Sequence, residues 1–227
     1  MHTRNHTAVG VDGCRGGWIA AIHRPDAEIQ WMLEQRIETI LQQVPRDATI
    51  LADMIIGLPD AGQPRRECDR LARKFLSPHG SRVFSAPPRE TLAAKTYPEA
   101  CQLARAATGK ALSKQCWHLI PKIRELDSIA DPRIRESHPE VAFARFNDGT
   151  PVAASKKSMA GQKARLRLLQ KVLPAALTAY LKVDITLGTG DYLQDDCIDA
   201  LALCAAAKES KALQAFDGGP GTPSIWY

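Results

Sequence analysis

The sequence predicts an α/β fold in which helices pack on a mixed β-sheet. Short apolar stretches at residues 8–12 and 49–53 are typical of buried strands, and both end in an aspartate. Between them, a glycine turn doubles the chain back, and apolar residues then recur at the three- and four-residue spacing of a helix. A strand that follows such a helix can pair parallel to the first strand, so the sheet is expected to be mixed.

The first elements are expected in the order strand, hairpin, strand, helix and strand. The expected strands are residues 8–12, 18–22, 29–33 and 49–53. Gly16-Gly17 supplies the turn between the first two strands. Apolar residues between positions 37 and 44 lie at helical spacing, and Pro45 ends that helix.

The chain changes character between about residue 60 and residue 133. Polar, helix-favouring stretches alternate there with single and paired prolines, which indicates a mostly helical insertion. The chain is expected to return to the sheet at 134–143, where His138-Pro139-Glu140 begins a strand. Pro121 is interpreted as one of the breaks between helices of the insertion.

The C-terminal third is expected to hold two helices and a tail. A long helix begins at about residue 158, and the last helix covers 195–208, where acidic residues at its start suit the helix dipole. The Gly- and Pro-rich residues 214–227 form a tail whose last three residues dock on the protein. The predicted organisation is one domain over 1–213, with the insertion at about 60–133, followed by this tail.

Composition places the chain among globular proteins of one core. Of its 227 residues, 44% are hydrophobic and 24% are charged, and no apolar run approaches the length of a membrane span. The N-terminal segment lacks the apolar stretch of a secretory signal. We therefore expect a cytoplasmic protein that is not associated with a membrane.

Charge and cysteine content narrow the function only slightly. The net charge of +5 and the sequence pI of about 8.9 are compatible with an anionic partner such as nucleic acid. Basic residues cluster at 65–74 and 156–171, for which solvated helix faces are the first interpretation. The six cysteines are scattered without a CxxC pair, which argues against a zinc site or a disulfide framework.

Four carboxylates are the candidates for chemistry. Asp12 and Asp53 each follow an apolar strand, and Asp196 and Asp199 lie three residues apart on one face of the last helix. If these groups converge, they repel one another unless a cation lies between them, and oxygen ligands favour Mg²⁺ or Mn²⁺. A pair of such ions can activate water for phosphodiester cleavage. Capping of turns and helices is the alternative role for each acid taken alone.

Glycine surrounds the first of these acids. Gly10, Gly13, Gly16 and Gly17 would let a backbone, a phosphate or a metal come close to Asp12, and we interpret them as clearance for a phosphate backbone.

The chain also resembles an uncharacterised family described as predicted RNase H-like nucleases, over nearly its whole length. The motifs that carry the resemblance are residues 10–18 (GVDGCRGGW), Asp53 with Gly57-Leu58-Pro59, residues 81–87 (SRVFSAP), residues 138–143 (HPEVAF), Ser155-Lys156-Lys157 with Gly161, and Asp195-Asp196 with Asp199-Ala200-Leu201. The last motif is also similar to the final helix of Holliday-junction resolvases. Ile55 departs from the family pattern, which commonly has proline there.

The resemblance implies an RNase H-like fold with metal ligands at Asp12, Asp53, Asp196 and Asp199, and Mg²⁺ or Mn²⁺ as cofactor. It adds Glu140 as a further acid of the catalytic site. It also makes basic residues candidates for phosphate binding, and these are Arg15, Lys156, Lys157 and, more weakly, Arg82.

The leading expectation is a metal-dependent nuclease that hydrolyses phosphodiester bonds of nucleic acid with an activated water. The sequence does not distinguish DNA from RNA as the substrate, and a small phosphodiester is considered as a third substrate class. A homodimer is compatible with the sequence. One alternative is a phosphotransferase of the actin and sugar-kinase type, which the chain length disfavours because those enzymes use two such cores. The other is a non-catalytic module that binds nucleic acid or protein.

Overall fold

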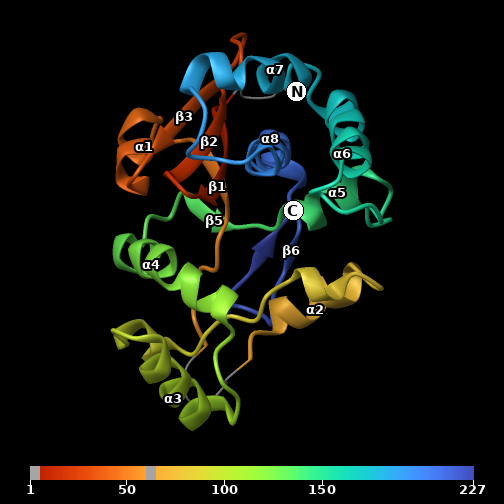
Figure 1. Ribbon diagram of the computed structural model, residues 1–227. Coiled ribbons are helices and arrows are strands. Elements are labelled where there is room, and N and C mark those ends of the chain that lie inside the picture. The colour runs from red at the N-terminus through yellow and green to blue at the C-terminus, as the bar shows by residue number, and fades with distance from the viewer. Residues whose placement is uncertain (1–5, 60–64) are drawn as a thin grey trace. The chain divides into compact units, whose positions relative to one another are not determined.

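The computed structural model describes residues 6–59 and 65–227 (Figure 1). Within these residues it contains a five-stranded mixed sheet, a two-stranded sheet and eight α-helices, which confirms the predicted α/β class. The chain forms two compact units. The first runs to Met54 and also includes Asp131–Gln214 and Trp226–Tyr227, and the second comprises Ile55–Ala130 and Ala215–Ile225.

The main sheet of the first unit has the strand order β3-β2-β1-β4-β5. Its strands are β1 (Ala8–Cys14), β2 (Gly17–His23), β3 (Gln30–Glu34), β4 (Thr49–Asp53) and β5 (Ile134–Glu136). The first three form an antiparallel meander, while β4 and β5 continue parallel to β1. The hairpin, the third strand and the parallel fourth strand all occur close to where the sequence places them.

The register of β1 and β4 brings two of the candidate acids together. The strands pair in parallel from Ala8 opposite Thr49 to Asp12 opposite Asp53. Parallel neighbours have their carboxyl ends at the same edge of the sheet, where functional groups of such sheets commonly gather. The expected adjacency of these two strands is therefore confirmed.

Helix α8 (Gln194–Lys208) packs directly on β1, and Gly10 makes this possible. A Cβ atom at Gly10 would lie 2.0 Å from the Ala200 carbonyl oxygen and 2.2 Å from the Cys204 nitrogen. The space at Gly10 is thus filled by the backbone of the chain's own helix, because β1 and α8 form the centre of the core. The expected close approach of a backbone is confirmed at Gly10, whereas the interpretation of Gly10 as clearance for a phosphate backbone is wrong.

Four further α-helices belong to the first unit. They are α1 (Ile37–Gln43), α5 (Pro139–Phe146), α6 (Met159–Val172) and α7 (Ala176–Leu187). Figure 1 shows α1 and α8 on opposite sides of the main sheet. Helices α5, α6 and α7 all contact α8, so α8 is enclosed and most of its residues are buried. Helix α7 has no counterpart among the expected elements.

The expectation that His138-Pro139-Glu140 begins a strand is wrong. Strand β5 ends at Glu136, and Pro139 is the first residue of α5. Proline is favoured at this position because its missing N–H has no helical partner there and its φ angle suits a helix. The His138 ring nitrogen Nδ1 accepts a 3.2 Å hydrogen bond from the Glu140 N–H and so caps the helix.

The second unit is mostly helical, as expected for the insertion. It contains α2 (Glu67–Phe75), α3 (Tyr97–Thr108) and α4 (Lys114–Ile129), together with 3₁₀ turns at Gly80–Arg82 and Arg89–Ala93. One of its cores consists of Ala94, Ala100, Cys101, Ala104, Leu112, Cys116 and Ile120. Pro121 does not separate two helices but lies inside α4, so its interpretation as a helix break is wrong.

The C-terminal segment is ordered into a small hairpin. Strands β6 (Ala215–Phe216) and β7 (Ile225–Trp226) form the two-stranded sheet. In the first unit, the backbones of Gln214 and Tyr227 exchange two hydrogen bonds of 2.9 Å. The Ser137 hydroxyl donates a 2.6 Å hydrogen bond to the Trp226 carbonyl. The expected docking of the last residues is confirmed.

Two expectations from composition can be compared directly with the structure. All six cysteines are buried and none forms a disulfide. Among the helices of residues 6–59 and 65–227, none has the length and apolar content needed to cross a membrane.

Candidate metal centre

Three carboxylates meet where β1, β4 and α8 come together. Asp12, Asp53 and Asp199 each offer an oxygen atom, and these oxygens lie within 4.8 Å of one another. Asp12 and Asp199 are only 6% and 1% exposed, and Asp53 is partly exposed. The register of β1 and β4 fixes Asp12 and Asp53, and the packing of α8 on Gly10 fixes Asp199. The cluster is therefore held by the rigid centre of the fold.

Burial and mutual repulsion make these acids difficult to ionise together. The pKa of Asp12 is raised well above its ordinary value, first by burial and then by the charges of Asp53 and Asp199. Burial is also the main cause that raises the pKa of Asp199 to about 7, while Lys156 opposes the shift. Without a further cation, one or more of these carboxyl groups keeps its proton near neutral pH.

Lys156 places a positive charge directly on this cluster. Its Nζ atom lies 2.5 Å from Asp199 Oδ2 and 3.7 Å from Asp195 Oδ2. Burial lowers the pKa of Lys156, but the charges of Asp199, Asp53 and Asp12 outweigh it and raise that pKa overall. The ammonium therefore stays charged. Lys156 was expected to contact a phosphate, and in the structure it pairs with Asp199.

The cluster nevertheless retains donor atoms for a metal ion. Asp199 Oδ1 is buried and has no hydrogen-bond partner, the single side-chain atom in that state in the described part of the chain. A buried polar atom without a partner is costly, and a water, an ion or a catalytic role commonly accounts for it. Asp12 Oδ1 accepts a 2.7 Å hydrogen bond from the Gly13 N–H. Three carboxylates offer the oxygen ligands that hard divalent cations prefer, and the site fits such an ion.

Glu140, expected to be a further acid of the site, forms a buried ion pair. The Arg165 guanidinium donates from Nη2 to both Glu140 oxygens, at 2.6 and 2.9 Å, and from Nε to Oε1 at 3.1 Å. Arg165 is 1% exposed and Glu140 is 6% exposed. Glu140 lies close enough to Asp199 to contribute to the raised pKa of Asp199. Its carboxylate is engaged by Arg165 rather than presented to the triad.

Arg165 also holds the segment that carries Lys156. Its Nη1 atom donates to the carbonyls of Ala154, at 3.0 Å, and Gly161, at 3.1 Å. A Cβ atom at Gly161 would lie 2.0 Å from the Ser155 carbonyl oxygen, so residues 154–155 pack directly on the first turn of α6. The ammonium of Lys156 therefore extends from a fixed turn.

The role of Arg165 was not predicted from the sequence. Arg165 was grouped with the basic residues of 156–171 as part of a solvated helix face, which is wrong for this residue because it is buried. Gly161, Arg165, Leu168 and Leu169 share the buried face of α6. Their spacing of three and four residues places the arginine on that face, and this was the available signal.

The remaining candidates lie outside the triad. Asp196 Oδ2 accepts a 2.8 Å hydrogen bond from the Leu193 N–H at the start of α8, which is the capping role considered as its alternative. Arg15 is exposed and lies 3.8 Å from Asp191, and Lys157 is exposed. Arg82 belongs to a 3₁₀ turn of the second unit. The structure thus unites three of the four expected metal ligands and adds Lys156 to them.

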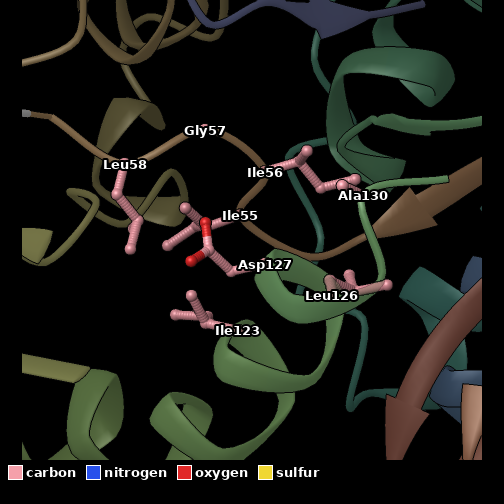
Figure 2. A pocket seen from close by; sticks show the side chains of 8 residues that line it. All are labelled: Ile55, Ile56, Gly57, Leu58, Ile123, Leu126, Asp127 and Ala130. Carbon is pink, nitrogen blue, oxygen red and sulfur yellow. The ribbon is translucent and has the colours of Figure 1, made fainter. Parts of the chain in front are cut away.

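A small cavity in the second unit has a different character (Figure 2). It has a volume of about 220 Å³, and its lining is apolar apart from Asp127. The Asp127 carboxylate accepts a 2.9 Å hydrogen bond from Arg89. A single carboxylate that is already paired does not form a catalytic set, so the triad is the stronger candidate.

Comparison with known proteins gives one result. A family model described as "Protein of unknown function (DUF429)" matches residues 10–216. This range includes the acidic triad, Lys156 and the Glu140–Arg165 pair. No curated protein and no solved structure matches the chain.

Proposed function

The chain belongs to the family described as "Protein of unknown function (DUF429)", and we propose that it is a divalent-metal-dependent nuclease with an RNase H-like core. The observation that carries the proposal is the buried triad of Asp12, Asp53 and Asp199, in which one oxygen atom has no hydrogen-bond partner. The antiparallel meander extended by two parallel strands supports the RNase H-like assignment, because it places both strand acids at one edge of the sheet.

The three triad residues would hold Mg²⁺ or Mn²⁺. When bound, such an ion supplies a Lewis acid that polarises a phosphoryl oxygen and activates water. The protein's own contribution is a rigid and largely dry set of negative charges that needs no rearrangement before the reaction. Asp196 caps α8 and Glu140 fixes Arg165, so both support the site without being ligands in this arrangement.

Lys156 is proposed to neutralise the site and to contact the substrate. Its ammonium pairs with Asp199 in the structure, and a phosphate group that enters the site offers it a second anion. Arg15 and Lys157 are exposed and able to bind neighbouring phosphates along a strand. Burial raises the pKa of the Cys197 thiol, which disfavours Cys197 as a thiolate nucleophile.

One observation favours a second function, a non-catalytic module that binds nucleic acid or protein. The Lys156 ammonium already supplies a positive charge among the acids. An acidic cluster neutralised in this way is able to persist as a structural element without a metal ion.

Metal binding and cleavage measured together decide between these functions. Calorimetric titration with MnCl₂ is combined with a cleavage panel of single-stranded, double-stranded and branched DNA and RNA. The nuclease predicts Mn²⁺ binding and cleavage that are both lost in Asp12→Asn and both retained in Asp47→Asn, a matched change at an exposed aspartate. Binding of Mn²⁺ without cleavage of any substrate would refute the nuclease. Absence of both Mn²⁺ binding and cleavage would refute the metal centre and support the non-catalytic module, in which Lys156 alone neutralises the acids.

A further inference from the structure

The second unit contains a groove that the proposed chemistry does not use. It has a volume of about 610 Å³, within the range of small-ligand sites. Its lining comes from the segment before α3 and from residues 117–124 of α4, namely Leu92, Ala93, Ala94, Lys95, Trp117, His118, Ile120, Pro121 and Arg124. The lining thus combines apolar, aromatic and basic side chains and includes no acidic one.

The charges of the groove are suited to an anion. Lys95, His118 and Arg124 line it, and no ion pair joins any of them to a carboxylate in the described part of the chain. Arg124 donates hydrogen bonds to the Leu92 carbonyl, at 2.6 and 3.0 Å, which fix its guanidinium at the wall of the groove. A fixed guanidinium that is not in an ion pair is well placed to bind phosphate.

The distribution of charge over the whole chain also favours an anion as the ligand of the second unit. The residues of the second unit include thirteen Lys and Arg against eight Asp and Glu, whereas the first unit has seventeen of each. The entire net charge of +5 therefore belongs to the second unit, while the unit with the acidic triad is neutral. Such an asymmetry favours binding of a polyanion by the second unit.

Trp117 provides an aromatic surface in the same groove. It is partly exposed and packs against Tyr97 with ring centroids 6.2 Å apart. By contrast, Trp18 and Trp31 are buried, and the Arg135 guanidinium lies over the ring of Trp226 at 4.4 Å. Trp117 is therefore the tryptophan best placed to stack on an external planar group.

Pro121 adds a hydrogen-bond acceptor beside this ring. It is exposed inside α4 and has no N–H to donate to the carbonyl of Trp117, four residues earlier. A proline inside a helix is destabilising. Because Pro121 is exposed, no burial of apolar surface offsets this cost. The proline also leaves the Trp117 carbonyl oxygen at the groove without its usual helical donor.

We propose that this groove binds one nucleotide of a single-stranded nucleic acid, with the base against Trp117 and the phosphates against Lys95, His118 and Arg124. The inference rests on the proposed function, because it names where the second unit holds the substrate strand. Base stacking on an aromatic side chain combined with basic residues along the backbone is how proteins bind single strands without sequence preference.

The test is strand binding measured in EDTA, so that the metal centre does not contribute. Fluorescence anisotropy with labelled dT12 and rU12 is compared for the wild-type chain, Trp117→Leu and Lys95→Gln. The stacking residue is expected to account for about 5- to 150-fold in affinity. Lys95→Gln should reduce the slope of log K against log salt concentration by about 0.7, the value for one phosphate contact. Lys110→Gln, at an exposed lysine of the same unit outside the groove, should leave that slope unchanged.

Two further arms separate the possible outcomes. A blunt duplex should bind at least tenfold more weakly than dT12, and UMP should compete with dT12 if a free nucleotide occupies the same site. Binding by Trp117→Leu equal to the wild type, or equal binding of duplex and single strand, would overturn the inference. Quenching of tryptophan emission by dT12 in the wild-type chain tests the stacking without any substitution. Binding of single strands without cleavage in Mn²⁺ would support the groove as a binding site and refute the nuclease proposal.

Discussion

Replacing Arg165 by methionine is expected to destabilise the first unit strongly, because the change leaves a buried carboxylate without its partner. The side chains of Arg165 and Glu140 are 1% and 7% exposed. Three hydrogen bonds of 2.6–3.1 Å join them. Removing one partner of a buried ion pair costs about 3–5 kcal/mol. The carbonyls of Ala154 and Gly161 lose their donor as well, so the upper part of this range is expected.

This loss is large enough to measure by two methods. In a chain of this size, 3–5 kcal/mol corresponds to a decrease of about 6–20 °C in Tm. Urea unfolding followed by circular dichroism gives the change in the free energy of unfolding. Arg133→Met is the matched control, because Arg133 also joins a carboxylate, that of Asp131, to backbone carbonyls but is 19% exposed. The control should lose less stability than Arg165→Met.

The double variant Glu140→Leu/Arg165→Met separates a structural pair from a catalytic acid. Replacing both members of a buried pair by apolar side chains is often close to neutral. The double variant should therefore recover most of the stability that Arg165→Met loses. A loss below about 1 kcal/mol in Arg165→Met, or losses that simply add in the double variant, would refute the description of this pair as a buried support for the segment of Lys156.

Three further changes test the site. In EDTA, the folded-state pKa of Asp199, about 7 against an ordinary 3.8, means that the folded protein binds this proton more tightly than the unfolded chain. Stability should thus fall as pH rises from about 4 to 7, by up to about 1.4 kcal/mol per pH unit, and MnCl₂ should remove this fall in urea unfolding curves. Lys156→Gln removes the ammonium that lies 2.5 Å from Asp199 and competes there with a metal ion. The affinity for Mn²⁺, measured by calorimetry, should therefore rise about tenfold, or 1.4 kcal/mol. An unchanged or weaker affinity would show that the ammonium does not compete with the metal ion. Gly10→Ala places a Cβ atom 2.0 Å from the Ala200 carbonyl oxygen. Thermal unfolding should therefore show that the free energy of unfolding falls by at least about 3 kcal/mol. A smaller decrease would mean that α8 moves away easily.

The sequence predicts those parts of the site that depend on local pattern. Asp12 and Asp53 follow apolar strands, and the strand period together with the helix between them determines that the two acids end side by side. The start and end of α8 could likewise be predicted from the sequence, because acidic residues begin the helix and a run of apolar residues follows them. The strands and the helix are each encoded within one short segment of the chain.

The parts that could not be predicted depend on contacts between distant segments. Lys156 reaches Asp199 across 43 positions of the chain, and Arg165 reaches Glu140 across 25. The helical spacing of Arg165 with Leu168 and Leu169 places it on the buried face of α6, but only the packing of α5 on α6 reveals that its partner is Glu140. The return of the chain to the sheet at residue 134 is confirmed by β5, but a strand start at His138-Pro139-Glu140 is wrong. Apolar residues in short segments suit either structure, and Pro139 as the first residue of a helix decides against the strand.

The position of Gly10 connects the stability of the fold with the geometry of the acids. Gly10 and Asp12 are two residues apart on β1, so they face the same side of the sheet. On that side, Gly10 receives the backbone of α8 at Ala200, the residue that follows Asp199. The contact that packs the helix on the sheet is therefore also the contact that sets Asp199 beside Asp12. A side chain at position 10 must either push α8 away, which separates the acids, or unfold the core. For this reason, Gly10→Ala should weaken Mn²⁺ binding even at temperatures where the variant is fully folded, and unchanged binding in the folded variant would contradict this coupling.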